Sequence, residues 1–272
     1  MASAYVHGYE PRENQRLQDQ ASTLVAMLHS DTTYPAGSRV LEAGCGVGAQ
    51  TITLASGSPQ ASITSIDVSA ESVVAAASAV RAAALRNVTL LQTDIFRLPF
   101  PDASFDHVFV CFVLEHLARP VNALRALRRV VRPGGSITVI EGDHGSTFFH
   151  PDSDYARRAI ACQVQLQARA NGNALIGRAL YPMLEEAGLR EVRVSPRMIY
   201  VDASKPQLVD GFTRRTFTAM IEGIRTSALD AGLMSAADFD RGVADLHRTA
   251  EPDGVFCYTF FKATGVNDTV AG

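Results

Sequence analysis

The sequence predicts an α/β protein built on a doubly wound, mostly parallel sheet of seven strands. Apolar runs with strand character alternate with helical patterns between residues 38 and 145. That alternation is typical of a parallel sheet with helices on both faces. In addition, Glu42, Asp67 and Asp94 follow the first three strands, where ligands bind in such sheets.

Residues 1–37 are expected to form an N-terminal helical cap. Proline suits the first position of a helix, so a helix is predicted to begin at Pro11. Apolar side chains then recur on one helical face, at Leu17, Ala21, Leu24, Val25 and Leu28.

Residues 38–145 are expected to form the ligand-binding core. Helices are predicted over 49–55, from Ser69 as N-cap, and from Pro120. Residues 132–135 are predicted to be a turn. The expected strands of the core are 40–43, 61–67, 87–94, 105–113 and 136–142.

Residues 146–272 are expected to form a substrate-side half. Helical patterns cover 153–170 and 181–189, and strands are predicted at 191–203 and 255–265. About 204–253 is a helical insertion, too long for a simple connector. It could cover the ligand end of the sheet, form an oligomer contact, or only pack.

The stretch "VLEAGCGVGAQ" places Gly44, Gly46 and Gly48 directly after the first strand. The pattern also fits the loose dinucleotide motif, so an NAD(P)-dependent oxidoreductase is one hypothesis. Glu42 argues against it, because a carboxylate suits a cation better than a diphosphate. Asp67 could accept hydrogen bonds from ribose hydroxyls, and Asp94 could accept from an exocyclic amine.

Four ordered motifs resemble the class I S-adenosylmethionine-dependent methyltransferases. They are "VLEAGCGVGAQT", "ITSIDVS", "LLQTDIFRLPFPDASFDHVFVCFVLEHL" and "LRRVVRPGGSITVIEGD". The resemblance implies a Rossmann-like fold, with S-adenosyl-L-methionine as cofactor and methyl transfer as the reaction.

The same resemblance implies roles for individual residues. Gly44 and Gly46 would pass close to the methionine and ribose, and Glu42 would lie near the ammonium. The other residues assigned to the cofactor are Asp67 and Val68 at the ribose, Asp94 and Ile95 at the adenine, and Cys111 and His116 near the methionine. Alternatively, His116 could be a structural residue at the start of a helix, with its ring hydrogen-bonded within the protein.

The N-terminal stretch resembles a subset of these enzymes that act on small molecules, in which the first helix folds over the cofactor. Arg16 or Gln20 would then hold the methionine carboxylate, and Tyr5 and Tyr9 would meet the substrate. The alternative for each is a solvated helix face.

His144, in the segment after the fifth strand, is the candidate base for O- or N-methylation of an aromatic or polyketide-like molecule. Asp143 or Glu141 is expected to orient it. Alternatively, His144 is a loop histidine or a substrate contact. Tyr200 is the second catalytic candidate.

Aromatic side chains are expected around the pocket, and they could stabilise a carbocation left when an alkene is methylated. The expected substrate-binding rings are Phe148, Phe149, Phe212 and Phe217. They could also be ordinary core. The chain further resembles bacterial secondary-metabolite methyltransferases, including those that C-methylate an isoprenoid side chain of an indole alkaloid, as in teleocidin-type pathways. The most specific expectation is therefore C-methylation of an isoprenoid chain, with cation-driven cyclisation as a further step.

Composition limits the other classes of function. The net charge is -3 and the basic residues do not cluster, so no nucleic-acid partner is expected. Four scattered cysteines indicate reduced buried thiols, with no metal site. The first residues lack a leader pattern and no apolar run reaches membrane length, so a soluble, cytoplasmic protein is expected, with no membrane partner. The N-terminal helix and the insertion are candidate contacts of a homo-oligomer.

Overall fold

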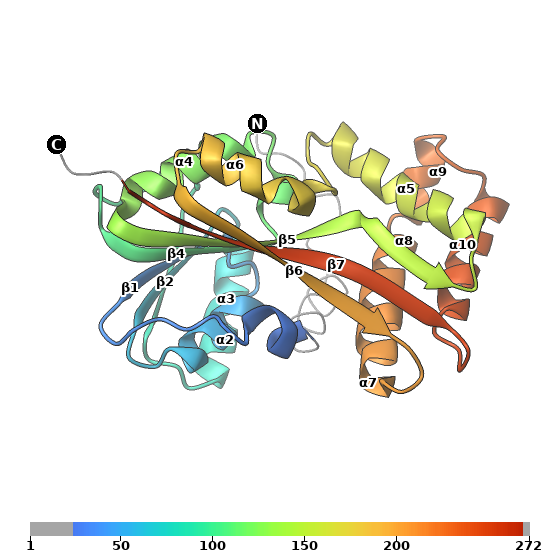
Figure 1. Ribbon diagram of the computed structural model, residues 1–272, viewed down its shortest axis with the longest axis horizontal. Coiled ribbons are helices and arrows are strands. Elements are labelled where there is room, and N and C mark those ends of the chain that lie inside the picture. Colours follow the sequence, from blue (N-terminus) through green and yellow to red (C-terminus); the bar gives the residue numbers. More distant parts are fainter. Residues whose placement is uncertain (1–23, 269–272) are drawn as a thin grey trace.

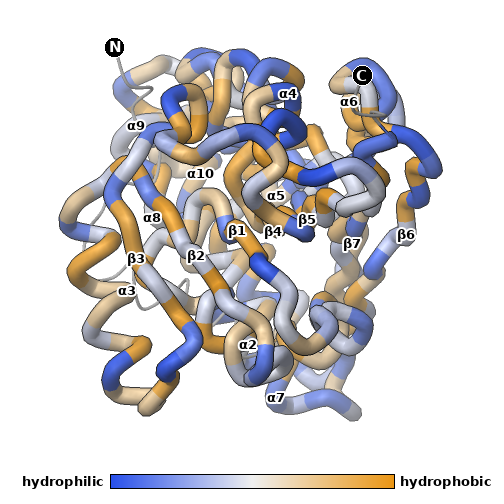
Figure 2. The backbone as a smooth tube through the Cα atoms, turned by 90° about the vertical axis from the view of Figure 1, so that its left-hand side faces the viewer, coloured by the Kyte–Doolittle hydropathy of each residue, from blue (hydrophilic) through white to orange (hydrophobic). Residues whose placement is uncertain are grey.

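The computed structural model describes residues 24–268, and its centre is one seven-stranded sheet (Figure 1). The strands are ordered β3-β2-β1-β4-β5-β7-β6, with β3 and β6 at the two edges (Figure 2). Their bounds are β1 Arg39–Ala43, β2 Ser62–Asp67, β3 Val88–Gln92, β4 Phe105–Cys111, β5 Val131–His150, β6 Arg190–Val201 and β7 Val255–Val266. The predicted doubly wound, mostly parallel sheet of seven strands is confirmed.

The pairs among β1 to β5 are all parallel, whereas β7 runs antiparallel to both β5 and β6. The strand order reverses between β1 and β4, so the carboxyl ends of these two strands flank the crevice where such sheets bind ligands. Pro196 is tolerated in β6 because an edge strand has one unpaired side.

Helices cover both faces of the sheet, with α4 and α6 on one face and α2 and α3 on the other (Figure 1). Side chains of Ser69, Ser153 and Ser235 cap the first turns of α3, α5 and α10. The helices are α2 Ala49–Gly57, α3 Ala70–Ala82, α4 Pro120–Val130, α5 Asp154–Arg169, α6 Leu180–Glu186, α7 Pro206–Leu208, α8 Ala219–Gly223, α9 Arg225–Asp230 and α10 Ala236–Arg248, with short 3₁₀ turns η1 Leu114–His116 and η2 Ile176–Ala179 and a π-helix, η3 Val209–Thr218.

The strand β5 is longer than predicted. Its expected end was Gly142, but it continues to His150 and pairs with β7 again at residues 148–150. Between Asp143 and Phe148 the register shifts, and this irregular segment hides the period-two pattern in the sequence. The predicted turn at 132–135 also lies within β5, at a second register shift, against β4.

The long strands β5, β6 and β7 extend past β1 to β4 and are covered there by α5, α8 and α10 (Figure 1). One buried cluster joins this extension to the rest: it includes Leu28 and Leu54, then Phe109 of β4, and Phe212 and Phe239 in the late helices. Residues 206–248 are almost entirely helical. Among residues 24–268, no helix has the length and apolar character needed to cross a membrane.

Candidate functional site

The glycine turn after β1 needs glycine for two different reasons. Gly44, Gly46 and Gly48 have φ of 79°, 51° and 85°, a region that other residues enter only with strain. A Cβ on Gly44 would collide with Val113, and one on Gly48 would lie 3.0 Å from the Cα of Ala76 in α3. A Cβ on Gly46 would meet nothing within 4 Å. The turn therefore packs at its ends and leaves open space at its centre.

Asp67, at the end of β2, fixes the turn in place. Its Oδ2 accepts from the Gly46 amide and its Oδ1 from the Ser69 amide, each at 2.9 Å. Each carboxylate oxygen has more than one acceptor site, so further hydrogen bonds can still be accepted. Val68 beside it is largely exposed. This is the arrangement expected of a residue that holds a pair of hydroxyls.

Asp94 lies after β3, where its Oδ1 accepts from the Phe96 amide at 2.9 Å. Asp94 and the neighbouring Ile95 are both half-buried. The carboxylate thus keeps the local turn rigid and still reaches the surface, as binding of an amine at this edge requires.

Glu42 is buried at the end of β1. One carboxylate oxygen, Oε2, accepts from both Thr51 Oγ1 and Ser65 Oγ at 2.6 Å. Burial raises the pKa of Glu42 to about 7. A cation bound next to this carboxyl would favour its ionised form, which fits the expected ammonium group.

The backbone leaves β4 in an unusual conformation. Phe112 has φ of 57°, and its amide donates to the Ile140 carbonyl at 2.9 Å. The Glu141 Oε1 accepts from the amides of Val113 and Leu114, at 3.0 and 2.7 Å. Strained backbone held by such contacts is a frequent feature of ligand sites.

The thiol of Cys111 is buried, and burial raises its pKa well above its ordinary value. Any contact of Cys111 with a ligand would therefore come from its backbone. His116 ends η1 with its Nε2 3.5 Å from Glu115 Oε1, and Gln167 donates to the other oxygen of Glu115 at 3.2 Å. All four cysteines of the chain are buried and unbridged.

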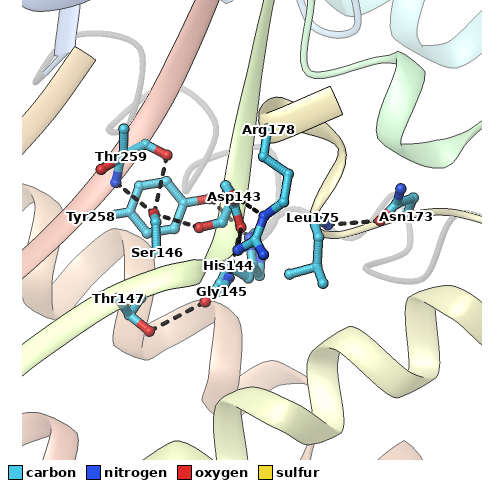
Figure 3. A network of polar contacts seen from close by, with 10 residues as sticks. All are labelled: Asp143, His144, Gly145, Ser146, Thr147, Asn173, Leu175, Arg178, Tyr258 and Thr259. Atoms are coloured by element: carbon cyan, nitrogen blue, oxygen red, sulfur yellow. Dashed lines mark hydrogen bonds and ion pairs between the residues drawn. The ribbon is translucent and has the colours of Figure 1, made fainter. Parts of the chain in front are cut away.

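His144 lies in the irregular segment of β5, buried beside β7. Its Nδ1 is 2.9 Å from the Tyr258 hydroxyl (Figure 3). Its ring is also 6.0 Å from that of Phe217, measured between centroids. Ser146 fixes the segment, because it accepts from the Thr259 amide at 2.9 Å and donates to the Asp143 carbonyl at 2.7 Å.

The expectation that Asp143 or Glu141 orients His144 was wrong. Asp143 forms a two-pronged pair with Arg178, at 2.6 and 2.8 Å (Figure 3). Glu141 instead accepts from the backbone amides of Val113 and Leu114, after β4. Neighbours along a strand face opposite sides of the sheet, so Asp143 points away from the face that carries Tyr258. Tyr258 takes the orienting place instead.

The four expected aromatic rings do not share one environment. Phe149 stacks on Phe256, and Phe212 and Phe217 are buried against β7. Phe148 is 55% exposed, because it points to the opposite face of β5 from Phe149. The structure therefore removes Phe148 from the set of candidate substrate contacts.

The edge strand β6 also alternates between the two faces of the sheet, and Tyr200 lies on the exposed one. It is 40% exposed on the edge strand β6, and Lys205 lies over its ring with Nζ 5.1 Å from the centroid. Its neighbours Ile199 and Val201 are the ones that enter the buried cluster. The alternation along β6 therefore places Tyr200 on the other face of the sheet from the buried cluster, and its catalytic role stays a prediction. Tyr5, Tyr9, Arg16 and Gln20 lie outside the described residues.

Phe260 and Tyr258, which the sequence analysis missed, connect Phe112 at the end of β4 to His144. Phe112 contacts Phe260 with centroids 5.5 Å apart, and Phe260 contacts Tyr258 at 4.7 Å. Phe256, Tyr258 and Phe260 alternate along β7, so the period of two was the available signal. The pairing of Tyr258 with His144, across 114 residues, had no local signal.

Comparison with known proteins gives a consistent result. Residues 41–139 match the family model described as a methyltransferase domain. An uncharacterised 37.1 kDa protein in a transposon of Streptomyces fradiae is 33% identical over 78% of this chain and 63% of its own length. The 27-O-demethylrifamycin SV methyltransferase of Amycolatopsis mediterranei is 28% identical over 86% of this chain and 80% of its own length.

Among solved structures, the [4+2]-cyclase SpnF superposes with a TM-score of 0.54. It is 23% identical and covers 91% of this chain and 80% of its own, so it supports the fold alone. The chain spans 63% and 53% of the first two curated relatives that it matches.

Proposed function

We propose that the chain is a class I S-adenosylmethionine-dependent methyltransferase, which its match to a methyltransferase-domain model over residues 41–139 supports, and that it methylates a small, largely apolar natural product. The observation that carries the proposal is the buried pair of His144 and Tyr258, which the rings of Phe260 and Phe112 connect to the end of β4. A polar pair in aromatic surroundings suits a mostly apolar acceptor with one reactive polar group.

The residues around the turn fit the cofactor. Asp67 would accept from the ribose hydroxyls, Asp94 would hold the adenine amine, and Glu42 would face the ammonium. The open space over Gly46 leaves room for the nucleoside. The cofactor supplies a methyl group already activated on a sulfonium, so the protein has to align the acceptor and exclude water.

The geometry supports an oxygen or nitrogen acceptor best. When His144 Nδ1 donates to Tyr258, the other ring nitrogen carries the lone pair that a base needs. His144 would take the proton of the acceptor as the new bond to the methyl carbon forms and the bond from that carbon to sulfur breaks. The Amycolatopsis relative, named for O-demethylated rifamycin, supports this acceptor class.

A carbon acceptor is the second candidate, and the rings favour it. Phe212, Phe217 and Phe256 pack within 6.5 Å of one another, measured between centroids. Aromatic faces stabilise a cation, such as the one left when an isoprenoid alkene takes a methyl group. A cyclisation driven by that cation would then follow. In this case His144 positions the substrate or removes a proton later.

Two measurements test the proposal. Calorimetric titration should show binding of S-adenosylmethionine and none of NAD, which would leave the oxidoreductase hypothesis without support. A methyl-labelled cofactor, incubated with small-molecule extracts, should then label a compound, and its mass and NMR spectra identify the methylated atom. Binding without any label would overturn methyl transfer, and SpnF, named as a cyclase, shows that the fold also occurs in proteins named for other reactions.

A further inference from the structure

The π-helix η3, Val209–Thr218, lies over the aromatic cluster and has an unusually wide buried face. Residues 211–213 and 216–218 are buried, whereas Asp210 and Arg215 are exposed. At its end the Ala219 amide donates to the Arg214 carbonyl, five residues back. Residues five apart therefore lie above one another on the same face. Long π-helical runs are rare, and π segments occur often at functional sites.

The middle of that face contacts the candidate reaction site. Phe212 and Phe217, five residues apart, have ring centroids 5.9 and 5.5 Å from that of Tyr258. Phe217 also contacts His144. Two successive turns of the helix therefore each place one phenylalanine ring, Phe212 or Phe217, against the pair of His144 and Tyr258.

The two flanks of the face differ in their hydrogen bonds. On one flank Thr216 Oγ1 donates to the Gly211 carbonyl at 2.7 Å, so the polar groups satisfy each other. On the other flank Thr213 and Thr218 are fully buried, and neither hydroxyl has a hydrogen-bond partner among residues 24–268. A buried hydroxyl without a partner is unfavourable, and two of them on one face point to an occupant.

We propose that Thr213 and Thr218 form a polar subsite that binds a hydroxyl or carbonyl oxygen of an otherwise apolar ligand, beside His144. The threonine hydroxyls can each donate and accept, so they suit either oxygen. The neighbouring rings of Phe212 and Phe217 would cover the apolar part. The subsite rests on the proposed function in one respect: its ligand is taken to be the methyl acceptor.

The alternatives make different demands. If the two hydroxyls belong only to the core, replacement by valine keeps the shape and removes two unsatisfied groups, so stability should hold or rise and ligand binding should not change. If buried water alone satisfies them, valine lowers stability, again without an effect on ligands.

The test uses two fluorescent probes of matched shape, 1-naphthol and 1-methylnaphthalene, which differ in the hydroxyl. Their affinities are measured on the full chain with saturating S-adenosylhomocysteine. The variants are Thr213→Val, Thr218→Val and the double variant, and Thr216→Val is the control on the satisfied flank. Melting temperatures are recorded for all of them.

The wild type should bind 1-naphthol about tenfold more tightly than 1-methylnaphthalene. The double variant should lose that preference while its melting temperature holds or rises, and Thr216→Val should keep it. Equal binding of the two probes by the wild type, binding of neither, or an unchanged preference in the double variant overturns the proposal. Because no turnover is measured, methyl transfer can fail or succeed independently of this result.

Discussion

Polar groups at the carboxyl ends of β1 to β3, the proposed cofactor end, find their partners differently from those in the substrate half. At the cofactor end, Asp67 accepts from the amides of Gly46 and Ser69, Asp94 accepts from the Phe96 amide, and Glu42 accepts from two hydroxyls. In the substrate half, His144 contacts a tyrosine 114 residues away, and two threonine hydroxyls of η3 have no hydrogen-bond partner in the described part of the chain. We therefore expect the cofactor to be bound mainly by residues that directly follow strands, and the acceptor by contacts between elements far apart in the sequence.

The largest test of the substrate half is His144→Ala. If the acceptor loses a proton during transfer, turnover should fall about 100- to 10,000-fold with normal cofactor affinity. The measurement is single-turnover transfer of labelled methyl, with titration of the cofactor alongside. Tyr258→Phe is the matched variant: it keeps the ring and removes the orienting hydroxyl, so its loss should be smaller.

A small effect of His144→Ala on turnover would instead favour the alkene acceptor. A parallel loss of cofactor affinity would contradict the comparison itself, because it would place His144 in the cofactor end.

The next effect concerns pH and Glu42. Its pKa rises from 4.5 to about 7 on folding, so its contribution to stability is fully present below pH 4.5 and is lost as the pH rises through 7. Without cofactor, the wild type should therefore lose about 3 kcal/mol relative to Glu42→Gln between pH 4.5 and 8. Urea denaturation of both proteins across this range measures the difference. Parallel curves would show that Glu42 is not so strongly desolvated.

A third prediction concerns the close contact between Gly48 and Ala76 of α3 at the cofactor end. Gly48→Ala adds a Cβ 3.0 Å from the Ala76 Cα and strains a residue with positive φ, so the free energy of unfolding should fall by about 2–3 kcal/mol. Gly232→Ala is the control, because its φ is also positive but its Cβ would meet open space. It should cost about 1 kcal/mol, from backbone strain alone. Equal losses would show that the contact between α2 and α3 can relax.

The smallest effect is on affinity at Asp67. Asp67→Ala removes a charged acceptor from the ribose hydroxyls and should weaken S-adenosylmethionine binding by about 2 kcal/mol. Asp106→Asn is the control, since Asp106 pairs with Arg39 and Arg132 away from the glycine turn and should leave affinity unchanged. Unchanged affinity in Asp67→Ala would show that the ribose lies elsewhere.

The turns after β1 and β2 could be predicted because several of their determinants are local. Three glycines with positive φ, acids directly after strands and the serine cap of α3 each act within a few residues. The seven strands also follow from their own period and composition. The length of β5 did not, because the shifted segment around "GDHGS" interrupts the pattern and only pairing with β7 makes it a strand.

The substrate half could be predicted only in part. Strand alternation, applied to neighbouring residues, would have separated Phe148 from Phe149 and Tyr200 from Ile199. The partners of Asp143 and His144 could not be found in this way, since Arg178 and Tyr258 meet them only when separate elements pack. The π-helical conformation of η3 also has no recognised sequence signature, so its unsatisfied hydroxyls could not be predicted from the sequence.

The length of β5 and β7 has a mechanical consequence. Both run from beneath α4 and α6 to the region under α5 and α10, β5 with its register shift between Asp143 and Phe148, so they join the two halves of the described chain in one sheet. Thermal unfolding should then be a single cooperative transition, and a ligand bound at either half should stabilise the same sheet.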